Sequence, residues 1–242
     1  MMTKTKIAGM GFYVPENVIT NKDLQKYMDT SDEWIQERTG IVERRYVKKH
    51  EETTSIMGAK AARKALDFAG VKKEDVDFII FATLSPDYFF PGSGVLMQRE
   101  LGITGTEIPA LDIRNQCSGF VYGLEVADQF IKTGKYKNIL LVGAEYQSMG
   151  MDFSTKGRNV SVIFGDGAGA VLLQPTTEEG KGILTTHIHS DGSNAEVLSF
   201  INPGSHGGYH LGKEHFGYDD SMPIGNGFIT EKMYKEDMLF PQ

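Results

Sequence analysis

Two near-continuous apolar runs, at 77–83 (DFIIFAT) and 137–144 (KNILLVGA), constrain the fold of this chain more than any other feature. A strand with one face in water alternates apolar and polar residues. An unbroken apolar run instead indicates a strand that helices cover on both faces. The clearest helical pattern, at 53–69, lies before the first run and ends at Gly70. Strands that alternate with helices predict an α/β fold with a largely parallel sheet.

Further segments extend this alternation along the chain. Strands are predicted at 6–14, 108–113, 160–164, 171–173 and 182–190. Helices are predicted after Thr20, from Thr30 or Ser31 to Gly40, at about 92–101, and from Cys117 to Lys132. The glycines at 165–170 are interpreted as a turn between two strands. A phosphate-binding loop would need a following helix and a Lys-Ser/Thr pair, so nucleotide binding is not predicted there.

The amino-acid composition argues against several classes of protein. A net charge of −7 argues against a dedicated nucleic-acid binder. The single cysteine excludes an internal disulfide and a zinc site built on several cysteines, and it suits a reducing cytoplasm. No run approaches the roughly 20 apolar residues of a membrane helix, and Gly9, Gly11 and Pro15 interrupt any signal-peptide core. We therefore expect a cytoplasmic protein that binds neither membrane nor nucleic acid.

Cys117 is the strongest candidate for chemistry. It lies between the strand predicted at 108–113 and the helix that follows it, where unpaired N–H groups and the helix dipole favour the thiolate. Ser118 and Gly119 are small and would let a substrate carbonyl approach backbone donors. A nucleophile at a strand-to-helix turn recurs in acyl-transfer enzymes. The alternative is that a lone cysteine is a small buried apolar residue.

Trp34 and Arg38 are four residues apart, hence on one helix face, where a ring and a guanidinium could hold a planar base or a phosphate. On spacing alone we favour the simpler interpretation, an amphipathic helix with its tryptophan in the core and its arginine solvated. His187 and His189 would share one strand face. No carboxylate lies at ligand spacing, so an ordinary half-exposed strand is favoured over a metal site.

The loop at 85–91 carries three adjacent aromatic residues, Tyr88, Phe89 and Phe90. They could insert into a neighbouring subunit or line an apolar pocket, and simple loop packing is an equal alternative.

Three segments together resemble β-ketoacyl-acyl carrier protein synthase III: 29–41 (DTSDEWIQERTGI), 117–120 (CSGF) and 163–170 (IFGDGAGA). The resemblance runs from residue 6 to at least residue 192. It implies the thiolase fold, in which two similar α/β halves stack as a layered sandwich, and a homodimer. Residues 1–175 would form the N-terminal half with the nucleophile. Residues 176–242 would begin a C-terminal half whose remainder is missing after residue 242.

By this resemblance, Cys117 accepts an acyl group from acyl-CoA as a thioester, and malonyl-acyl carrier protein then decarboxylates and attacks it to give 3-oxoacyl-acyl carrier protein. Coenzyme A is part of a substrate, and no cofactor or metal is implied. Trp34 and Arg158 match positions that hold the adenine end of coenzyme A, and Arg38 and Thr30 match nearby positions. Phe90 matches a phenylalanine that enters the partner's acyl pocket.

The chain departs from the family pattern at three places. The family's catalytic histidine and asparagine come from the second half, and none of the histidines here matches, so we expect that 242 residues alone cannot condense. Arg114-Asn-Gln116 replaces small residues and would alter the acyl pocket or the primer. The glycine- and histidine-rich loop at 202–217 has no counterpart that we can align.

Two other hypotheses stay open. One is a different thiolase-superfamily condensing enzyme, of the long-chain, polyketide or alkylquinolone type. The other is a non-catalytic partner subunit, in which Cys117 would be unreactive. A cysteine hydrolase is a weaker third, because no sequence pattern pairs a histidine with Cys117.

Overall fold

The computed structural model of the chain describes residues 3–48, 52–195 and 197–199. These residues form two compact units, each built from segments that are far apart in the sequence. The larger unit contains the described residues of Met1–Asn17, Arg45–Tyr146 and Gly165–His189, and the smaller one those of Val18–Arg44, Gln147–Phe164 and Ser190–Gln242. The division at residue 175 stays a prediction, because most of 176–242, including the loop at 202–217, lies outside the described residues.

The larger unit is built on a five-stranded sheet with the order β1-β7-β6-β4-β5. Strand β4 is paired in parallel with both β5 and β6, whereas β7 is antiparallel to both β6 and β1. Strand β7 therefore runs against the other strands of this sheet, and the predicted largely parallel α/β sheet is confirmed. The strands are β1 (Lys4–Tyr13), β4 (Phe78–Ala82), β5 (Ala110–Ile113), β6 (Ile139–Glu145) and β7 (Gly167–Thr176).

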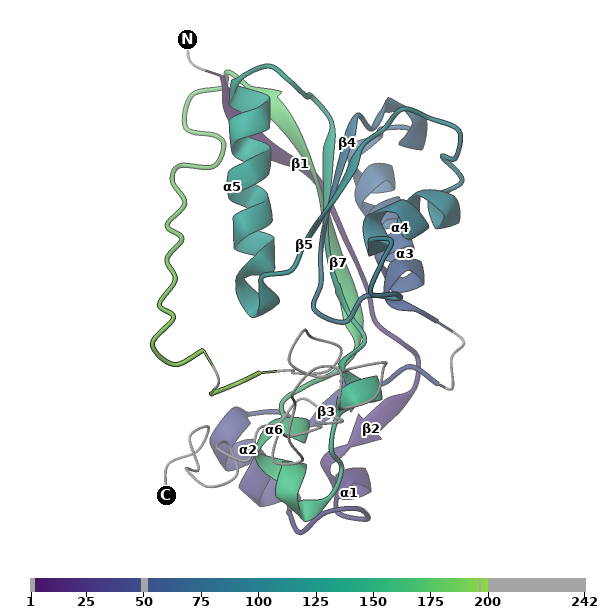
Figure 1. The fold of residues 1–242 in the computed structure, drawn as a ribbon, viewed down its shortest axis with the longest axis vertical. Helices are drawn as coiled ribbons and strands as arrows, with labels where there is room; N and C mark the ends of the chain where they lie inside the picture. Colours follow the sequence, from purple (N-terminus) through teal and green to yellow (C-terminus); the bar gives the residue numbers. More distant parts are fainter. Residues whose placement is uncertain (1–2, 49–51, 196, 200–242) are drawn as a thin grey trace, which may run out of the picture. The chain divides into compact units, whose positions relative to one another are not determined.

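Helices cover both faces of this sheet (Figure 1). Helices α3 (Thr54–Ala69) and α4 (Ser93–Leu101) lie on one face, and α5 (Gly119–Lys132) lies on the other. Successive β4 residues alternate between two buried clusters, because side chains of a strand point to opposite faces. Ile79 and Phe81 pack in the cluster with α3 and α4, and Phe78 and Ile80 in the cluster with α5. The prediction of a strand buried on both faces is confirmed for β4.

The strand predicted at 108–113 is β5. It lies at the edge of the sheet, and among the described strands only β4 pairs with it. Its residues are half-buried or exposed. A short apolar run does not reveal whether a strand has one neighbour or two.

The strand predicted at 171–173 is confirmed as part of β7, but the strand predicted at 160–164 and the glycine turn after it are wrong. A 3₁₀ turn, η4 (Thr155–Gly157), leads into a short helix, α6 (Arg158–Ser161), and Gly167 and Gly169 belong to strand β7. Val160 and Val162 are buried, which explains why the segment is apolar although it is helical. A side chain at Gly167 would have its Cβ 3.1 Å from the carbonyl oxygen of Tyr13, so glycine here allows close strand pairing rather than a turn.

The strand predicted at 182–190 is also wrong. These residues are described as irregular, and most of their side chains are exposed. The backbone N–H of Ile183 donates to the carbonyl of Thr5, but no ladder follows. Alternation of apolar and polar residues is not enough to form a strand without a neighbour that pairs with it.

The smaller unit contains two helices whose predicted starts are confirmed. Helix α1 (Asn21–Leu24) begins after Thr20 with a capping box, and α2 (Asp32–Thr39) begins after Ser31, whose hydroxyl accepts from the N–H of Trp34. Strands β2 (Val18–Thr20) and β3 (Glu43–Arg45) form a two-stranded sheet. The apolar centre of this unit is formed by Leu24, Met28, Ile35 and Val162.

Short 3₁₀ turns complete the element list: η1 (Lys73–Asp75), η2 (Gln116–Ser118) and η3 (Gln147–Gly150). Among the described residues, we find no helix with the length and apolar character needed to cross a bilayer.

Candidate functional site

Cys117 lies in the turn η2, between the edge strand β5 and helix α5, as predicted. Its thiol is exposed, so the alternative of a buried apolar cysteine does not hold. The Ser118 hydroxyl donates to the carbonyl of Asn115 (3.0 Å) and makes no cap on α5. The first N–H groups of α5, which directly follow Cys117 in the chain, therefore have no side-chain cap from Ser118.

The segment before Cys117 is fixed by Asp112, at the β5 position two residues before Arg114. Its carboxylate accepts hydrogen bonds from the backbone N–H groups of Ser93 (2.5 Å) and Gly94 (2.9 Å), at the start of α4. Burial raises the pKa of this carboxyl, although the two N–H bonds act in the opposite direction. A Cβ on Gly94 would lie 2.8 Å from the carboxylate oxygen, so only glycine leaves room for this contact.

A second half-buried carboxylate, that of Glu145 at the end of β6, fixes the segment that follows β4. It accepts from the backbone N–H groups of Leu84 (2.9 Å) and Ser85 (3.1 Å) and from the Ser85 hydroxyl (2.5 Å). Burial raises the pKa of Glu145. Because β4, β5 and β6 are parallel, Glu145 at the end of β6 and Cys117 after the end of β5 lie at the same end of the sheet.

Asp87, within the aromatic loop at 85–91, connects this loop to the starts of α3 and α4. It accepts from the backbone N–H of Ser55 (3.0 Å) at the start of α3, and from the hydroxyls of Ser55 (2.8 Å) and Ser93 (2.9 Å). Sequence reasoning missed the roles of Asp87, Asp112 and Glu145. One sequence pattern could have indicated them: an acidic residue in an apolar strand or just after it, near the predicted start of a helix.

The aromatic side chains of this loop are exposed: 57% for Tyr88, 61% for Phe89 and 82% for Phe90. Simple packing of the loop on its own unit therefore does not account for them. The guanidinium of Arg114 lies 5.2 Å from the centroid of the Phe89 ring, a cation–π contact. Arg114, which departs from the family pattern, thus connects the Cys117 segment to the aromatic loop.

The smaller unit brings together Trp34, Arg38 and Arg158. The Arg38 guanidinium lies 4.4 Å from the centroid of the Trp34 ring, and the Arg158 guanidinium lies 5.0 Å from it. Trp34 is half-buried against the apolar centre of this unit. Trp34 thus packs against the apolar centre and Arg38 is exposed, as the interpretation favoured on spacing alone expects, and the ring also contacts both guanidinium groups.

Backbone contacts hold Arg158 in this arrangement. Its Nη1 donates to the carbonyl of Asp29 (2.7 Å), and the N–H of Asp29 donates to the hydroxyl of Thr155 (3.0 Å). The hydroxyl of Thr30, the next residue, is buried and has no hydrogen-bond partner among the described residues. The predicted residues thus divide between the units: Thr30, Trp34, Arg38 and Arg158 in the smaller one, Phe90 and Cys117 in the larger one.

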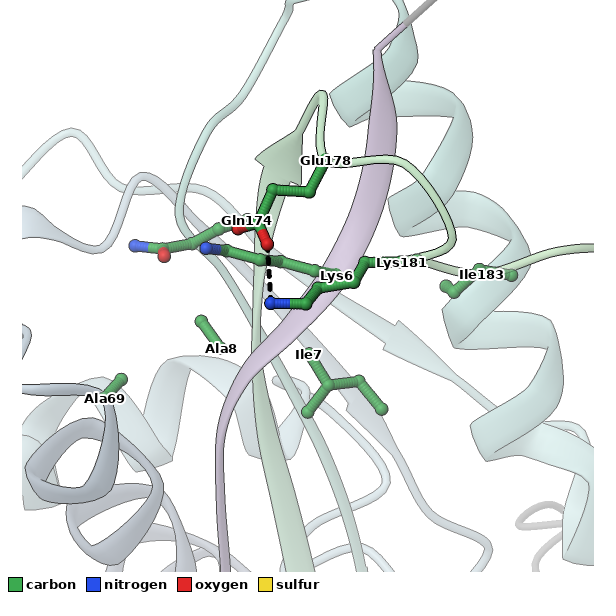
Figure 2. A pocket seen from close by; sticks show the side chains of 9 residues that line it. Lys6, Ile7, Ala8, Ala69, Gln174, Glu178, Lys181 and Ile183 are labelled. Carbon is green, nitrogen blue, oxygen red and sulfur yellow. Dashed lines mark ion pairs between the residues drawn. The ribbon is translucent and has the colours of Figure 1, made fainter.

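A hollow of about 660 Å³ lies elsewhere on the larger unit (Figure 2). It is lined by Lys6, Gln174 and Ile183, among others, and includes the ion pair between Glu178 and Lys181. Strand pairing places Lys6 and Gln174 at the level where β4 and β6 begin, whereas Cys117 follows the ends of the parallel strands. This hollow is therefore not part of the Cys117 site. Within the described ranges, no cluster of three or more His, Cys, Asp or Glu residues could hold a metal ion.

Comparisons with known proteins show which proteins the chain is similar to. The 3-oxoacyl-[acyl-carrier-protein (ACP)] synthase III family model matches residues 111–192. The β-ketoacyl-[acyl-carrier-protein] synthase III of Methylococcus capsulatus is 45% identical over 207 residues, which cover 86% of this chain and 62% of that protein. The 3-oxoacyl-[acyl-carrier-protein] synthase III structure from Aquifex aeolicus is 48% identical, with a TM-score of 0.77, over 83% of this chain and 63% of that one.

A third similarity is to the priming β-ketosynthase of the R1128 polyketide pathway, at 31% identity and a TM-score of 0.67, over 72% of this chain and 51% of that one. The chain spans about three fifths of the length of the curated relatives it matches. The predicted thiolase-like fold is confirmed by these structures. The predicted resemblance is therefore confirmed: over most of its length the chain is similar in sequence and structure to members of the 3-oxoacyl-[acyl-carrier-protein] synthase III family.

Proposed function

We propose that Cys117 performs the acyl-accepting step of a 3-oxoacyl-acyl carrier protein synthase III. Its thiolate attacks the thioester carbonyl of an acyl-CoA, a bond forms between Sγ and the acyl carbon, and the bond to the coenzyme A sulfur breaks. Coenzyme A leaves as a thiolate that takes up a proton. The observation that carries this proposal is an exposed thiol in the turn between strand β5 and helix α5, where an acyl-CoA thioester can reach it.

For the whole protein, the second step would be attack on this thioester by the carbanion that malonyl-acyl carrier protein forms on losing CO₂. The product is 3-oxoacyl-acyl carrier protein, and the thiol of Cys117 is regenerated. The names of the relatives support the carrier protein as partner. The resemblance assigns decarboxylation to a histidine and an asparagine. His187 and His189, in the irregular segment, do not match that position.

We assign coenzyme A binding to the smaller unit. The Trp34 ring offers a stacking surface for the adenine of coenzyme A. Arg38 and Arg158 offer positive charge to the phosphates of the same ligand. The buried hydroxyl of Thr30, unpartnered among the described residues, would complete the set as a donor or acceptor. These four residues stay proposals that the contacts support.

Phe90 supports the proposal of a homodimer. An 82% exposed phenylalanine at the end of a fixed loop is unfavourable in water unless another surface covers it. By the family resemblance, that surface is the acyl pocket of a second copy. We also place the protein in the cytoplasm, where acyl-CoA and carrier protein are found together.

Intact-mass spectrometry after incubation with acyl-CoAs of increasing length tests the acyl-accepting step. The chain has one cysteine, so a single acyl adduct that is absent from Cys117→Ala is the expected result. Ser118→Ala keeps the thiol and serves as the matched control, which should still be acylated. A folded wild-type chain that takes up no acyl group from any acyl-CoA would exclude the proposed role of Cys117 and favour a non-catalytic subunit.

A second candidate is a condensing enzyme that starts polyketide chains. It is favoured by the likeness to the R1128 priming β-ketosynthase. The same experiment separates the two, because adduct yields across the acyl-CoA series show which primers Cys117 accepts. A strong preference for long or aromatic acyl groups would support the polyketide, alkylquinolone or long-chain type over fatty acid synthesis.

A further inference from the structure

The aromatic loop is fixed at its base and supported at its tip by one side chain. Its base is held by the hydrogen bonds that join Asp87 to the starts of α3 and α4. Its tip consists of Tyr88, Phe89 and Phe90, whose side chains are exposed. Across the described chain, the one hydrogen-bonding, ionic or ring contact of these three side chains is that of the Phe89 ring with the Arg114 guanidinium, at 5.2 Å from the ring centroid. Arg114 therefore determines where the tip lies.

Arg114 reaches the tip from a fixed piece of backbone. It is the first residue after β5. The carbonyl of Ile113 accepts a hydrogen bond from the N–H of Thr83 (3.1 Å), and the carboxylate of Asp112 caps α4. In the part of the chain that the structure describes, the exposed guanidinium makes no ion pair and no hydrogen bond, so the Phe89 ring is its partner. A cation that extends from a fixed base can hold a ring in one place.

The same short segment carries the thiol. Arg114 and Cys117 both lie between the end of β5 and the start of α5. Their Cα atoms are at most about 11 Å apart, because consecutive Cα atoms are separated by about 3.8 Å. An acyl chain of several methylenes on Sγ can span a distance of this order, whereas an acetyl group adds only one methyl beyond the thioester carbon. A long acyl group on Cys117 can therefore meet the tip, and an acetyl group cannot.

We propose that Arg114 is a positioning residue that makes Cys117 select short acyl groups. Its guanidinium holds Phe89, and the tip held in this way restricts the space open to a long acyl chain on the thiol. A long chain must break the contact between Arg114 and Phe89 to move the tip, whereas an acetyl group leaves this contact intact. This inference rests on the proposed acylation of Cys117.

The rates at which the full chain is acylated by acetyl-CoA and by octanoyl-CoA test this role. Intact-mass spectrometry over time gives both rates. In Arg114→Ala, the ratio of the octanoyl rate to the acetyl rate should rise roughly two- to fivefold, the factor that corresponds to one exposed cation–π contact. Arg99→Ala is the matched control, because it removes one exposed positive charge from α4 of the same unit. It should keep the wild-type ratio.

Two further variants separate positioning from bulk and from direct contact with substrate. Arg114→Met keeps a long side chain without the cation, so its ratio should rise as in Arg114→Ala. Phe89→Ala removes the ring, and addition of Arg114→Ala to it should change the ratio no further, because Arg114 acts through Phe89. A wild-type ratio in Arg114→Met would assign the effect to bulk. A further change of the ratio in the double variant would assign it to direct contact. Either result overturns the inference.

The control experiments distinguish a failed inference from a failed function. Urea denaturation shows whether each variant is folded, and its midpoint should change little because the Arg114 and Phe89 side chains are exposed. If the wild type is acylated and Arg114→Ala keeps the wild-type ratio, the positioning role alone is overturned. If the folded wild type takes up neither acyl group, the proposed role of Cys117 is overturned, and this inference with it.

Discussion

Asp112 and Ser93 are joined by a 2.5 Å hydrogen bond between a side-chain carboxylate and a backbone N–H. The bond connects the strand that leads to Cys117 with the first turn of α4, which follows the aromatic loop. A negative charge at a helix N-terminus is favourable, and Gly92 gives α4 no side-chain cap of its own. Asp112 therefore provides the cap for α4 from another part of the chain.

Replacement of Asp112 by asparagine should lower the free energy of unfolding by about 1–3 kcal/mol. The amide keeps one acceptor oxygen but directs an NH₂ group at the second backbone donor, which then loses its partner in a partly buried site. Urea denaturation measures the change. Glu107→Gln, an exposed acid in the loop before β5, is the control and should stay within about 0.5 kcal/mol of wild type. Equal stabilities of the two variants would show that the Asp112 cap contributes nothing.

Glu145 should make stability depend on pH in a defined direction. Burial raises its pKa above the ordinary value of 4.5, so the folded state binds this proton more strongly than the unfolded state does. The resulting stabilisation is fully present below pH 4.5 and is lost as the pH rises through the raised pKa. The difference in unfolding free energy between wild type and Glu145→Gln should therefore fall as the pH rises above 4.5. A difference that grows with pH would contradict the raised pKa.

Sequence patterns predicted the elements whose burial is uniform. Strand β4 is buried on both faces, and helix α3 is buried along one whole face. The spacing of their apolar residues therefore identifies each element unambiguously. The patterns failed where neighbours decide the structure. Val160 is apolar and β-branched, as in a strand, yet it lies in the short helix α6 because its unit buries it there. Residues 182–190 alternate correctly and remain irregular because no strand of the described chain pairs with them.

Only part of the candidate site was predicted, because patterns along the chain do not reveal contacts between distant segments. Cys117 was identified because its position depends on local order along the chain, a strand followed by a helix. Asp112 and Glu145 were missed because their partners, at Ser93 and Ser85, are far away in the sequence. The stack of Arg158 on Trp34 depends on a contact between segments over a hundred residues apart, which only the family resemblance suggested.

Gly157 should tolerate no side chain. A Cβ at this position would overlap the carbonyl oxygen of Asp152, whose carbonyl carbon would be 2.8 Å away. Gly157→Ala must therefore move the turn that carries Arg158, and we expect a loss of about 1–3 kcal/mol in unfolding free energy, measured in urea. Gly169→Ala is the matched control, because a Cβ there meets nothing within 4 Å. If Gly157→Ala is as stable as Gly169→Ala, the close approach to Asp152 is not present in solution.

Arg158→Ala should weaken coenzyme A binding by roughly five- to thirtyfold, which corresponds to the loss of about 1–2 kcal/mol of charge-assisted contact with the ligand's phosphates. Arg158→Lys should not restore it, because a lysine lacks the planar fork that both stacks on Trp34 and donates to the Asp29 carbonyl. Isothermal titration calorimetry measures the affinities. Lys156→Ala removes one positive charge two residues away and is the control. If it weakens binding as much as Arg158→Ala does, the effect is one of net charge, and Arg158 has no specific contact with the ligand.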